Sequence, residues 1–454
     1  MVMRFYKYKR KGVRMKFFLS LIFCLASLSL AQMTMNAATW DTWIADADAI
    51  AAMVEAPSES VREAELQELI ALARDRDADA LEAVRYWNAA APSYRWTEVV
   101  NDTYKSGSPN PLAGRAFTLV NIAIYDAVIA SYKAKSSDMM SPAMSKDLET
   151  LVPVHGASFP SEHAAAAIAA SEVLAYVNPD NADMFRAMAE EAIESRLLAG
   201  ANYKSDLEAG RVIGEAVAKD VIAAAMLDGS DAAWEYTKPE GSRFTTENPV
   251  FPMTGNWKTW AIEDGKQFRV APPPAYDSAE LAADLEEIKA VEAVLPNIQQ
   301  ASYWATFYTA NQIWYDFVSK QLFEQRQADN APLMALIYSG IAVAQYDSIV
   351  GCFDSKYAYV LARPSHIDSD IKPLFGPPPH PSYPSAHSCA STAQATVAAH
   401  FFPHVAEEAF ANAGAAGQSR ILAGIHYQVD NTAGTELGSN VAGVVIEKLE
   451  GMTQ

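Results

Sequence analysis

Two of the histidines and three of the cationic side chains between residues 356 and 430 are the residue types needed to hold a tetrahedral oxyanion and to move a proton beside it. Arginine and lysine donate charge-assisted hydrogen bonds to such anions, and histidine exchanges protons near neutral pH. These residues lie in three short signatures, Lys356–Pro364, Pro384–His387 and Ser419–Asp430. The stretch therefore predicts a site for chemistry on a bound oxyanion, for which the rest of the chain is the scaffold.

The first signature contributes two cations that are seven residues apart. Because that spacing is about two helical turns, Lys356 and Arg363 would extend from the same face of one helix. Pro364 disfavours helical geometry at the preceding residue, so this helix is expected to end at Arg363. A solvated stripe of charge is the alternative interpretation, but apolar neighbours such as Val360 and Leu361 favour an enclosed pair.

The second signature is expected to be the start of a helix that continues to Phe402, since proline is common in the first turn. The free backbone N–H groups of Ser385 and Ala386 would form an anion seat there, and the Ser385 hydroxyl would add a further donor. Taken alone, such a tetrapeptide is an ordinary helix start. It gains weight as one of three signatures.

His426 and Asp430 of the third signature are four residues apart, the spacing at which side chains meet on a helix. The carboxylate can hold one imidazole nitrogen protonated and leave the other free to attack or to ligate. Arg420 adds a planar fork of donors suited to a tetrahedral oxyanion, and His387 is placed to deliver or remove a proton. An ordinary surface pair is the alternative for His426 and Asp430 taken alone.

The chain contains an internal repeat at an offset of 224 residues. Aligned without a gap, residues 195–222 and 419–446 share 14 identities in 28 positions, and the segments 158–163 and 382–387 match at the same offset. So close a match at one fixed offset indicates an internal duplication.

The two copies differ at positions that carry chemistry. Three residues of the first copy replace functional residues of the second: Asn202 stands for His426, Glu162 for Ala386, and Met139 for Arg363. A carboxylate beside an anion pocket and the loss of a histidine and an arginine would each abolish the predicted chemistry. The first copy is therefore expected to be a structural half.

Composition and apolar periodicity predict an all-α protein, since alanine-rich segments dominate and no stretch alternates as a β-strand does. Arg62–Ala83, for instance, has no Gly or Pro to break a helix. We predict two tandem, four-helix-bundle-like halves, the second carrying the site. The predicted order is a signal peptide over 1–31, an N-terminal bundle over 32–228, a Trp- and Pro-rich connector over 229–277, and a catalytic bundle over 278–454.

The first residues are predicted to form a secretory signal. Seven Lys and Arg residues precede the apolar run Phe17–Leu30, which is too short to span a bilayer, and a small-x-small cleavage site ends at Ala31. The mature protein is expected to be secreted or periplasmic without stable membrane association, with an uncleaved anchor as the alternative. Removing the segment lowers the formal net charge from −20 to −27, which disfavours nucleic acid and favours a small or neutral partner.

With the gaps between them, the signatures K-x6-R-P, P-S-x-H and S-R-x5-H-x3-D resemble a known pattern. It is shared by type 2 phosphatidic acid phosphatases, bacterial class A acid phosphatases and vanadium-dependent haloperoxidases. The resemblance implies a helical-bundle core whose anion site holds phosphate in some members and vanadate in others. It implies that the oxyanion is held by Lys356, Arg363, Ser385, the Ala386 amide and Arg420. His426 would be the vanadium ligand or the phosphate nucleophile, and His387 the acid-base residue.

Three features favour the haloperoxidase branch. The tandem bundles, His380 seven residues before His387, and the segment 423–430 resemble bromoperoxidases. The implied enzyme oxidises bromide or iodide with hydrogen peroxide, while Lys356 polarises the bound peroxide, and the hypohalous product halogenates a small organic acceptor outside any tight specificity pocket. One departure is Ala386, where the superfamily usually has glycine; the amide is kept, but the methyl group restricts φ. His380 as an ordinary polar residue of a Pro-rich loop is the alternative.

An acid phosphatase that cleaves phosphomonoesters uses the same cage and stays open as the second interpretation. His426 would then form a phosphohistidine, and His387 would protonate the leaving group. A catalytically silent binding or structural protein is the third, and it predicts damage to the second copy, of which Ala386 is the only sign. A homo-oligomer is compatible with each of the three.

Overall fold

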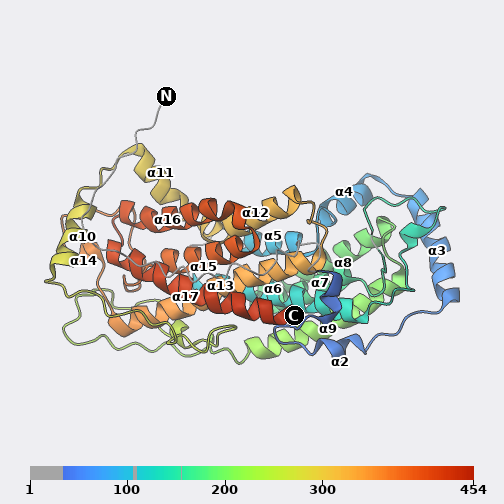
Figure 1. The fold of residues 1–454 in the computed structure, drawn as a ribbon, viewed down its shortest axis with the longest axis horizontal. Helices are drawn as coiled ribbons and strands as arrows, with labels where there is room; N and C mark the ends of the chain where they lie inside the picture. Colours follow the sequence, from blue (N-terminus) through green and yellow to red (C-terminus); the bar gives the residue numbers. More distant parts are fainter. Residues whose placement is uncertain (1–33, 106–109, 155) are drawn as a thin grey trace.

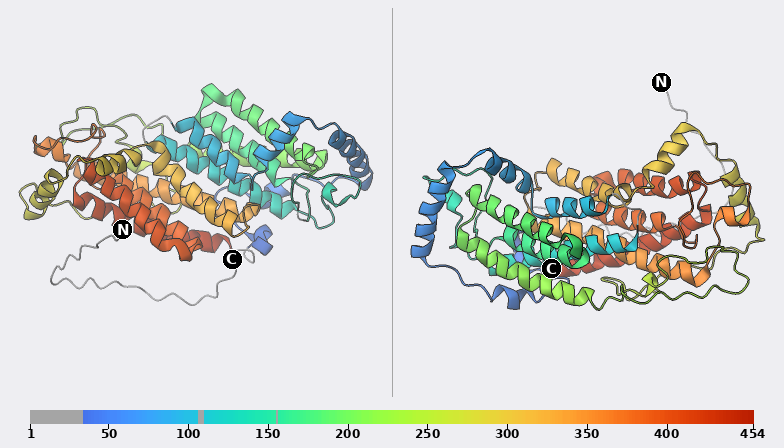
Figure 2. Two further views of the ribbon diagram at one scale, coloured as in Figure 1. Left: turned by 90° about the horizontal axis from the view of Figure 1, so that it is seen from above. Right: turned by 180° about the vertical axis from the view of Figure 1, so that it is seen from behind.

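The computed structural model describes residues 34–454 except 106–109 and 155, so the predicted signal segment lies outside the described residues. This part of the chain is all-helical, as predicted, and contains no β-structure beyond an isolated bridge between Met140 and Ala157. The molecule is elongated, with helices of the first half at one end and helices of the second half at the other (Figures 1 and 2).

The helices of the first half are α2 Ala47–Ala51, α3 Glu59–Arg74, α4 Ala78–Trp87, α5 Ser93–Tyr104, α6 Pro111–Ala134, α7 Glu162–Val177, α8 Ala182–Leu198 and α9 Lys204–Ala225. Those of the second half are α10 Ala279–Lys289, α11 Leu295–Tyr303, α12 Phe307–Glu324, α13 Ala331–Tyr359, α14 Pro364–Ile367, α15 Ala386–Phe401, α16 Ala406–Leu422 and α17 Gln428–Met452. Short 3-10 segments are η1 Thr34–Thr39, η2 Pro142–Met144, η3 Pro179–Asn181, η4 Thr254–Asn256 and η5 Pro403–Val405.

α6 and α13 form the centre of the molecule. Both are long and apolar enough to cross a membrane, yet 94% of the most apolar window of each is buried inside the protein, as in core helices. They pack against each other, and the Thr118 hydroxyl donates to the Ala342 carbonyl oxygen at 3.1 Å across this contact. One apolar core continues from the first half into the second. The division into separate bundles at 228 and 278 stays a prediction.

Equivalent contacts recur in the two halves at the offset of 224 residues. They are the left-handed glycines that follow α8 and α16, Gly200 and Gly424; the backbone hydrogen bonds of 2.9 Å from Ser161 to Asp206 and from Ser385 to Asp430; and the residues that cap α9 and α17, Tyr203 and Tyr427. These repeated contacts support the predicted duplication, which stays a prediction.

Residues 229–277 run along α13 and contain no helix except η4. The carboxylate of Asp347 accepts the backbone N–H groups of Trp260, Ala261 and Ile262 at 3.0, 2.7 and 3.1 Å. Trp257 stacks on Tyr346 with the ring centroids 6.2 Å apart. The buried carboxylate thus fixes a segment that has no regular structure of its own, as a packed connector requires.

Two helix bounds differ from the prediction. α13 ends at Tyr359, because Val360 adopts a left-handed conformation with φ 49°, and Arg363 instead occupies the N-cap of α14. Lys356 and Arg363 therefore do not share a helix. Likewise, Arg62–Ala83 is divided into α3 and α4, because the Asp77 side chain accepts the Ala80 N–H at 2.8 Å and starts a new helix.

Candidate active site

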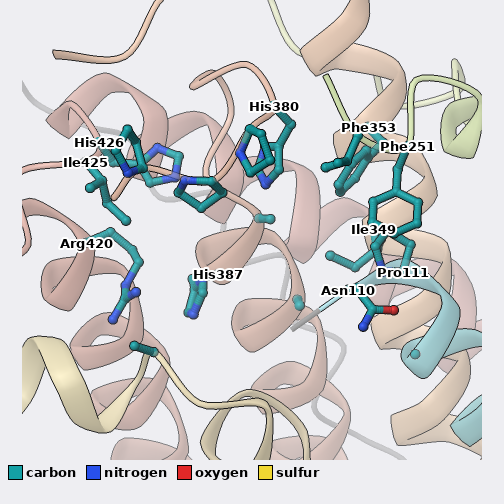
Figure 3. Close-up of a pocket in the computed structure, with 18 of the residues that line it drawn as sticks. Asn110, Pro111, Phe251, Ile349, Phe353, His380, His387, Arg420, Ile425 and His426 are labelled. Carbon is teal, nitrogen blue, oxygen red and sulfur yellow. The ribbon is translucent and has the colours of Figure 1, made fainter. Parts of the chain in front are cut away.

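A cavity of about 640 Å³ lies where α15 and α17 begin. Figure 3 shows four of the predicted residues gathered on one side of it, namely His380, His387, Arg420 and His426. The other side is mainly apolar, with Pro111 of α6, Phe251 of the connector, and Ile349 and Phe353 of α13, and the polar Asn110 lies beside them. The cavity thus combines a polar cage with an apolar wall.

His426 and Asp430 meet as predicted, although not as two residues of one helix. Tyr427 is the N-cap of α17, so His426 precedes the helix and Asp430 lies in its first turn. The Asp430 Oδ2 accepts the Tyr427 N–H at 3.1 Å and lies 2.6 Å from Nδ1 of His426. The Ser382 hydroxyl donates to the same oxygen at 2.5 Å. The capping carboxylate of α17 therefore also orients the imidazole.

The contacts of His426 define its tautomer. Its Nε2 lies 2.8 Å from Nη1 of Arg363, and a guanidinium can only donate, so Nε2 carries the lone pair and Nδ1 the proton. The pKa of His426 is held well below its usual range, mainly by burial and further by the positive charges of Arg363 and Lys356. Burial raises the pKa of Asp430 to about 6, against the opposing hydrogen bond from Ser382. At neutral pH the site thus holds a neutral imidazole whose unprotonated Nε2 accepts from Arg363 and can ligate or attack when an anion takes over that hydrogen bond.

Arg363 connects the first signature with the third and with the loop that precedes the second. Besides His426, its guanidinium donates to the carbonyl oxygens of Ile425 at 2.8 Å and His380 at 3.1 Å. Burial lowers the pKa of Arg363 to about 10, so it remains charged at neutral pH. The structure thus places this predicted oxyanion binder directly beside the His426 lone pair, although Arg363 itself is not among the residues that line the cavity.

Lys356 lies beneath the second signature and is not among the residues that line the cavity. Its buried ammonium donates to the carbonyl oxygens of Pro381, Ser382 and Pro384. Burial lowers the pKa of Lys356 to about 8. In this arrangement Lys356 supports the loop, and its contact with an oxyanion stays a prediction.

The start of α15 differs in part from the predicted anion seat. The N–H of Ser385 is not free, because it donates to the Asp430 carbonyl oxygen at 2.9 Å, and the Ser385 hydroxyl accepts the Ser388 N–H at 3.4 Å. Ala386 lines the cavity, and its N–H belongs to the first turn of α15, which lacks partners within the helix. Of the donors predicted for this anion seat, the Ala386 N–H therefore remains available at the cavity.

His387 and Arg420 complete the cage. Nε2 of His387 lies 2.7 Å from the Trp304 carbonyl oxygen, so this nitrogen carries the proton. Burial, and then Arg420, lower the pKa of His387 to about 3. The Arg420 guanidinium donates to the Ser419 hydroxyl at 2.9 Å and to the Ala301 carbonyl oxygen at 2.6 Å. Burial lowers its pKa to about 10.

His380 also lines the cavity, with its ring 5.2 Å from that of Phe353. Its Nδ1 lies 3.2 Å from Nη2 of Arg363 and 3.2 Å from the Pro381 carbonyl oxygen. The tautomer decides which of these is a hydrogen bond, since the first requires a lone pair and the second a proton. Burial, and then Lys356, lower the pKa of His380 well below its usual range.

Several site residues were not predicted from the sequence. Ser382 bonds Asp430 directly, and the repeat of Ser158 and Ser382 in the two copies was a signal that could have identified it. Asn110 and Pro111 at the start of α6 and Phe251 of the connector line the cavity from remote parts of the chain. No motif marks them, because only tertiary packing brings them to the site.

Residues 332–450 match the sequence model of the PAP2 superfamily. The three signatures that resemble this superfamily all lie within the matched region, so the predicted resemblance is confirmed. The match contains every residue of the cage described above. Comparison with curated proteins gave no match.

Solved structures show that the likeness extends beyond the PAP2 region. A crystal structure described as the first bacterial vanadium-dependent iodoperoxidase is 21% identical, with a TM-score of 0.60, and the alignment covers 78% of this chain and 95% of that one. A holo-type bacterial vanadium-dependent chloroperoxidase is 15% identical, with a TM-score of 0.57 over 78% of this chain and 96% of that one. Its apo-type counterpart is 14% identical, with a TM-score of 0.57 over 77% and 98%. At these identities the likeness establishes a shared fold.

Proposed function

We propose that the chain is a vanadate-dependent haloperoxidase that oxidises bromide or iodide with hydrogen peroxide and halogenates a small organic acceptor. The observation that carries this proposal is the neutral His426, whose Nε2 lone pair faces a cage of buried arginines. The structural neighbours described as vanadium-dependent peroxidases support it.

The donors present fit a tetrahedral oxyanion such as vanadate. Nε2 of His426 would be the metal ligand, while Arg363, Arg420 and the Ala386 N–H would hold the anionic oxygens. Vanadate held there would supply the activation of hydrogen peroxide toward halide.

The chain's own residues orient the ligand and handle protons. Asp430 keeps Nδ1 of His426 protonated and so fixes the ring with its lone pair toward the cage. His387 is neutral and can accept a proton from a substrate. The apolar wall offers space for the organic acceptor, and burial of the cage strengthens each interaction with an anion.

Secreted acid phosphatase activity is the second candidate. A neutral imidazole with an unprotonated Nε2 is equally suited to attack phosphorus. In that case the apolar wall would face the organic part of a phosphomonoester.

A paired assay on the purified protein tests both candidates. Bromination and iodination of a dye with hydrogen peroxide are measured with and without orthovanadate, beside hydrolysis of p-nitrophenyl phosphate. Halogenation that requires vanadate and is lost in His426→Ala is the expected result. Phosphate release that is inhibited by vanadate and lost in the same variant, without halogenation, would replace the proposal by the phosphatase.

A further inference from the structure

A second, smaller cavity of about 100 Å³ lies in the first half, where α7 and α9 begin. His163 and Arg196 line it, and they are the counterparts of His387 and Arg420 at the offset of 224 residues. Glu162, Asn202 and Asp329 line it as well. The cavity thus occupies in the first half the position that the active cavity occupies in the second.

The first half also has a counterpart of Lys356, which the fixed offset did not identify. Lys135 donates at 3.1 Å to the carbonyl oxygens of both Ala157 and Pro160, and these residues correspond to Pro381 and Pro384, which Lys356 contacts. Lys135 and Lys356 differ by 221 positions rather than 224, because Lys135 lies 22 positions before Ala157 whereas Lys356 lies 25 positions before Pro381. The supporting lysine is therefore present twice.

The counterpart of Arg363 is Ser141 rather than Met139, which corrects the alignment made at a fixed offset. The Ser141 hydroxyl donates to the Ala201 carbonyl oxygen at 2.8 Å, and Arg363 donates to the equivalent oxygen of Ile425 at 2.8 Å. Both residues directly precede a proline. Serine keeps this single contact but is too short to reach into the cavity.

Glu162 supplies a negative charge inside this cavity. Its carboxylate lies 2.9 Å from Nζ of Lys135, and its side chain is 19% exposed. Burial opposes ionisation of Glu162, but Lys135, His163 and Arg196 outweigh it and lower its pKa to about 2. At the equivalent position of the second half, Ala386 has no group that could do this.

We propose that the first half keeps a reduced tetrahedral-oxyanion site around His163 and Arg196 and that the Glu162 carboxylate fills it from within. Arg196 lines the cavity, and Lys135 reaches it through its ion pair with Glu162. Glu162 and Asp329 balance these two cations, so the wild-type cavity takes no external anion. Removal of the Glu162 side chain leaves a net positive charge and empty space beside Lys135. Inorganic phosphate and vanadate are the ligands of matching charge and shape.

The test is calorimetric titration of the purified protein with inorganic phosphate. Glu162→Ala is expected to bind one more phosphate per chain than the wild type, whatever number the wild type binds. Because the readout is this difference, it does not depend on the reaction that the second half performs. Glu172→Ala is the matched control, since it removes a carboxylate of the same helix that pairs with Arg186 on the surface at 2.7 Å; its stoichiometry should equal that of the wild type.

If Glu162→Ala folds poorly, thermal unfolding with and without phosphate replaces the titration as the test. Ligand binding to the native state alone raises Tm, so phosphate is expected to raise the Tm of Glu162→Ala more than that of Glu172→Ala, or to restore folding if the variant is unfolded in plain buffer. An unchanged stoichiometry together with equal phosphate responses of the two variants overturns the proposal.

The reciprocal variant is Ala386→Glu, which places a carboxylate at the equivalent position of the second half. This arm rests on the proposed function, because it requires that the wild-type cage bind an oxyanion. Ala386→Glu is expected to fold like the wild type but to lose the binding of vanadate and phosphate. Retained binding in Ala386→Glu would show that a carboxylate at this helix position does not reach the anion site, and it would overturn the assignment of Glu162.

Discussion

Nη1 of Arg363 lies 2.8 Å from Nε2 of His426, although the two residues come from different signatures and lie 63 positions apart in the chain. The guanidinium satisfies the lone pair of a buried imidazole that would otherwise lack a partner. An oxyanion bound at Nε2 would accept the same guanidinium protons. We infer that Arg363 holds His426 in its binding-competent tautomer before the anion arrives.

Arg363→Lys is therefore expected to weaken vanadate binding by about 10–100-fold, the cost typical of losing a residue that orients a metal ligand. A single ammonium cannot contact the Ile425 and His380 carbonyl oxygens and the anion together. Titration calorimetry measures the Kd. The control is Arg269→Lys, which alters an arginine paired with Asp354 at 2.7 Å outside the cavity. Equal Kd values for the two variants would contradict this role.

Oxyanion binding is expected to take up protons. Burial and then Arg420 lower the pKa of His387 to about 3, so it is neutral in the free cage. An anion beside it favours the charged imidazolium and raises this pKa, so on binding the ring takes up protons at pH values above about 3, where it is neutral in the free cage. The measurement is the dependence of the calorimetric enthalpy on the ionisation enthalpy of the buffer.

The source of these protons can be assigned with matched variants. His387→Ala should take up fewer protons than the wild type. His404→Ala should not differ from the wild type, because His404 bonds Gln321 at 3.0 Å outside the cavity. Undiminished uptake in His387→Ala would assign the protons to another group.

The sequence predicted the helical class and the main residues of the cage because both are encoded locally. Residues within one signature are only a few positions apart, so Asp430 must lie near His426, and Ser385 must lie near the start of α15. The end of α13 could not be predicted, because a β-branched residue such as Val360 rarely adopts a left-handed conformation. It does so here where Val360 packs with Phe244 of the connector.

The directions of individual donors also depend on tertiary structure. Lys356 was predicted to face the anion, but the fold brings three loop carbonyl oxygens to its ammonium. The Ser385 N–H was predicted to be free, but Asp430 of another helix accepts it. Sequence spacing identifies which residues approach the site, and packing decides which of their polar atoms remain available.

The stability contributed by Glu162 is expected to depend on pH. Its pKa is lowered to about 2 in the folded protein from its ordinary value of 4.5, with Lys135, His163 and Arg196 outweighing burial. A depressed folded-state pKa stabilises the protein above the unfolded pKa, and this stabilisation is lost as the pH falls toward the folded value. The wild type should therefore exceed Glu162→Gln in unfolding free energy by at most about 3 kcal/mol at neutral pH.

Denaturant unfolding at several pH values measures this difference. The advantage of the wild type should be complete above pH 4.5 and should disappear as the pH approaches 2. Glu55→Gln, on the exposed surface of the same half, is the control and should show little difference at any pH. A difference between wild type and Glu162→Gln that is constant with pH would mean that the side chain acts through packing alone.

The close contact of α15 and α17 is expected to determine both the free energy of unfolding and the affinity of the cage for vanadate. A Cβ atom at Gly438 would lie 2.3 Å from the Cys389 carbonyl oxygen, so Gly438→Ala must separate the two helices whose first turns carry His387 and Asp430. Overpacking of this kind costs about 1–3 kcal/mol of unfolding free energy, and vanadate affinity should fall with it.

The control is Gly443→Ala on the same helix, where an added Cβ atom meets nothing within 4 Å. This variant should instead stabilise the protein by about 0.5–1 kcal/mol through helix propensity. Denaturant unfolding and vanadate titration of both variants measure these effects; equal changes in the two would exclude the helix contact as their cause.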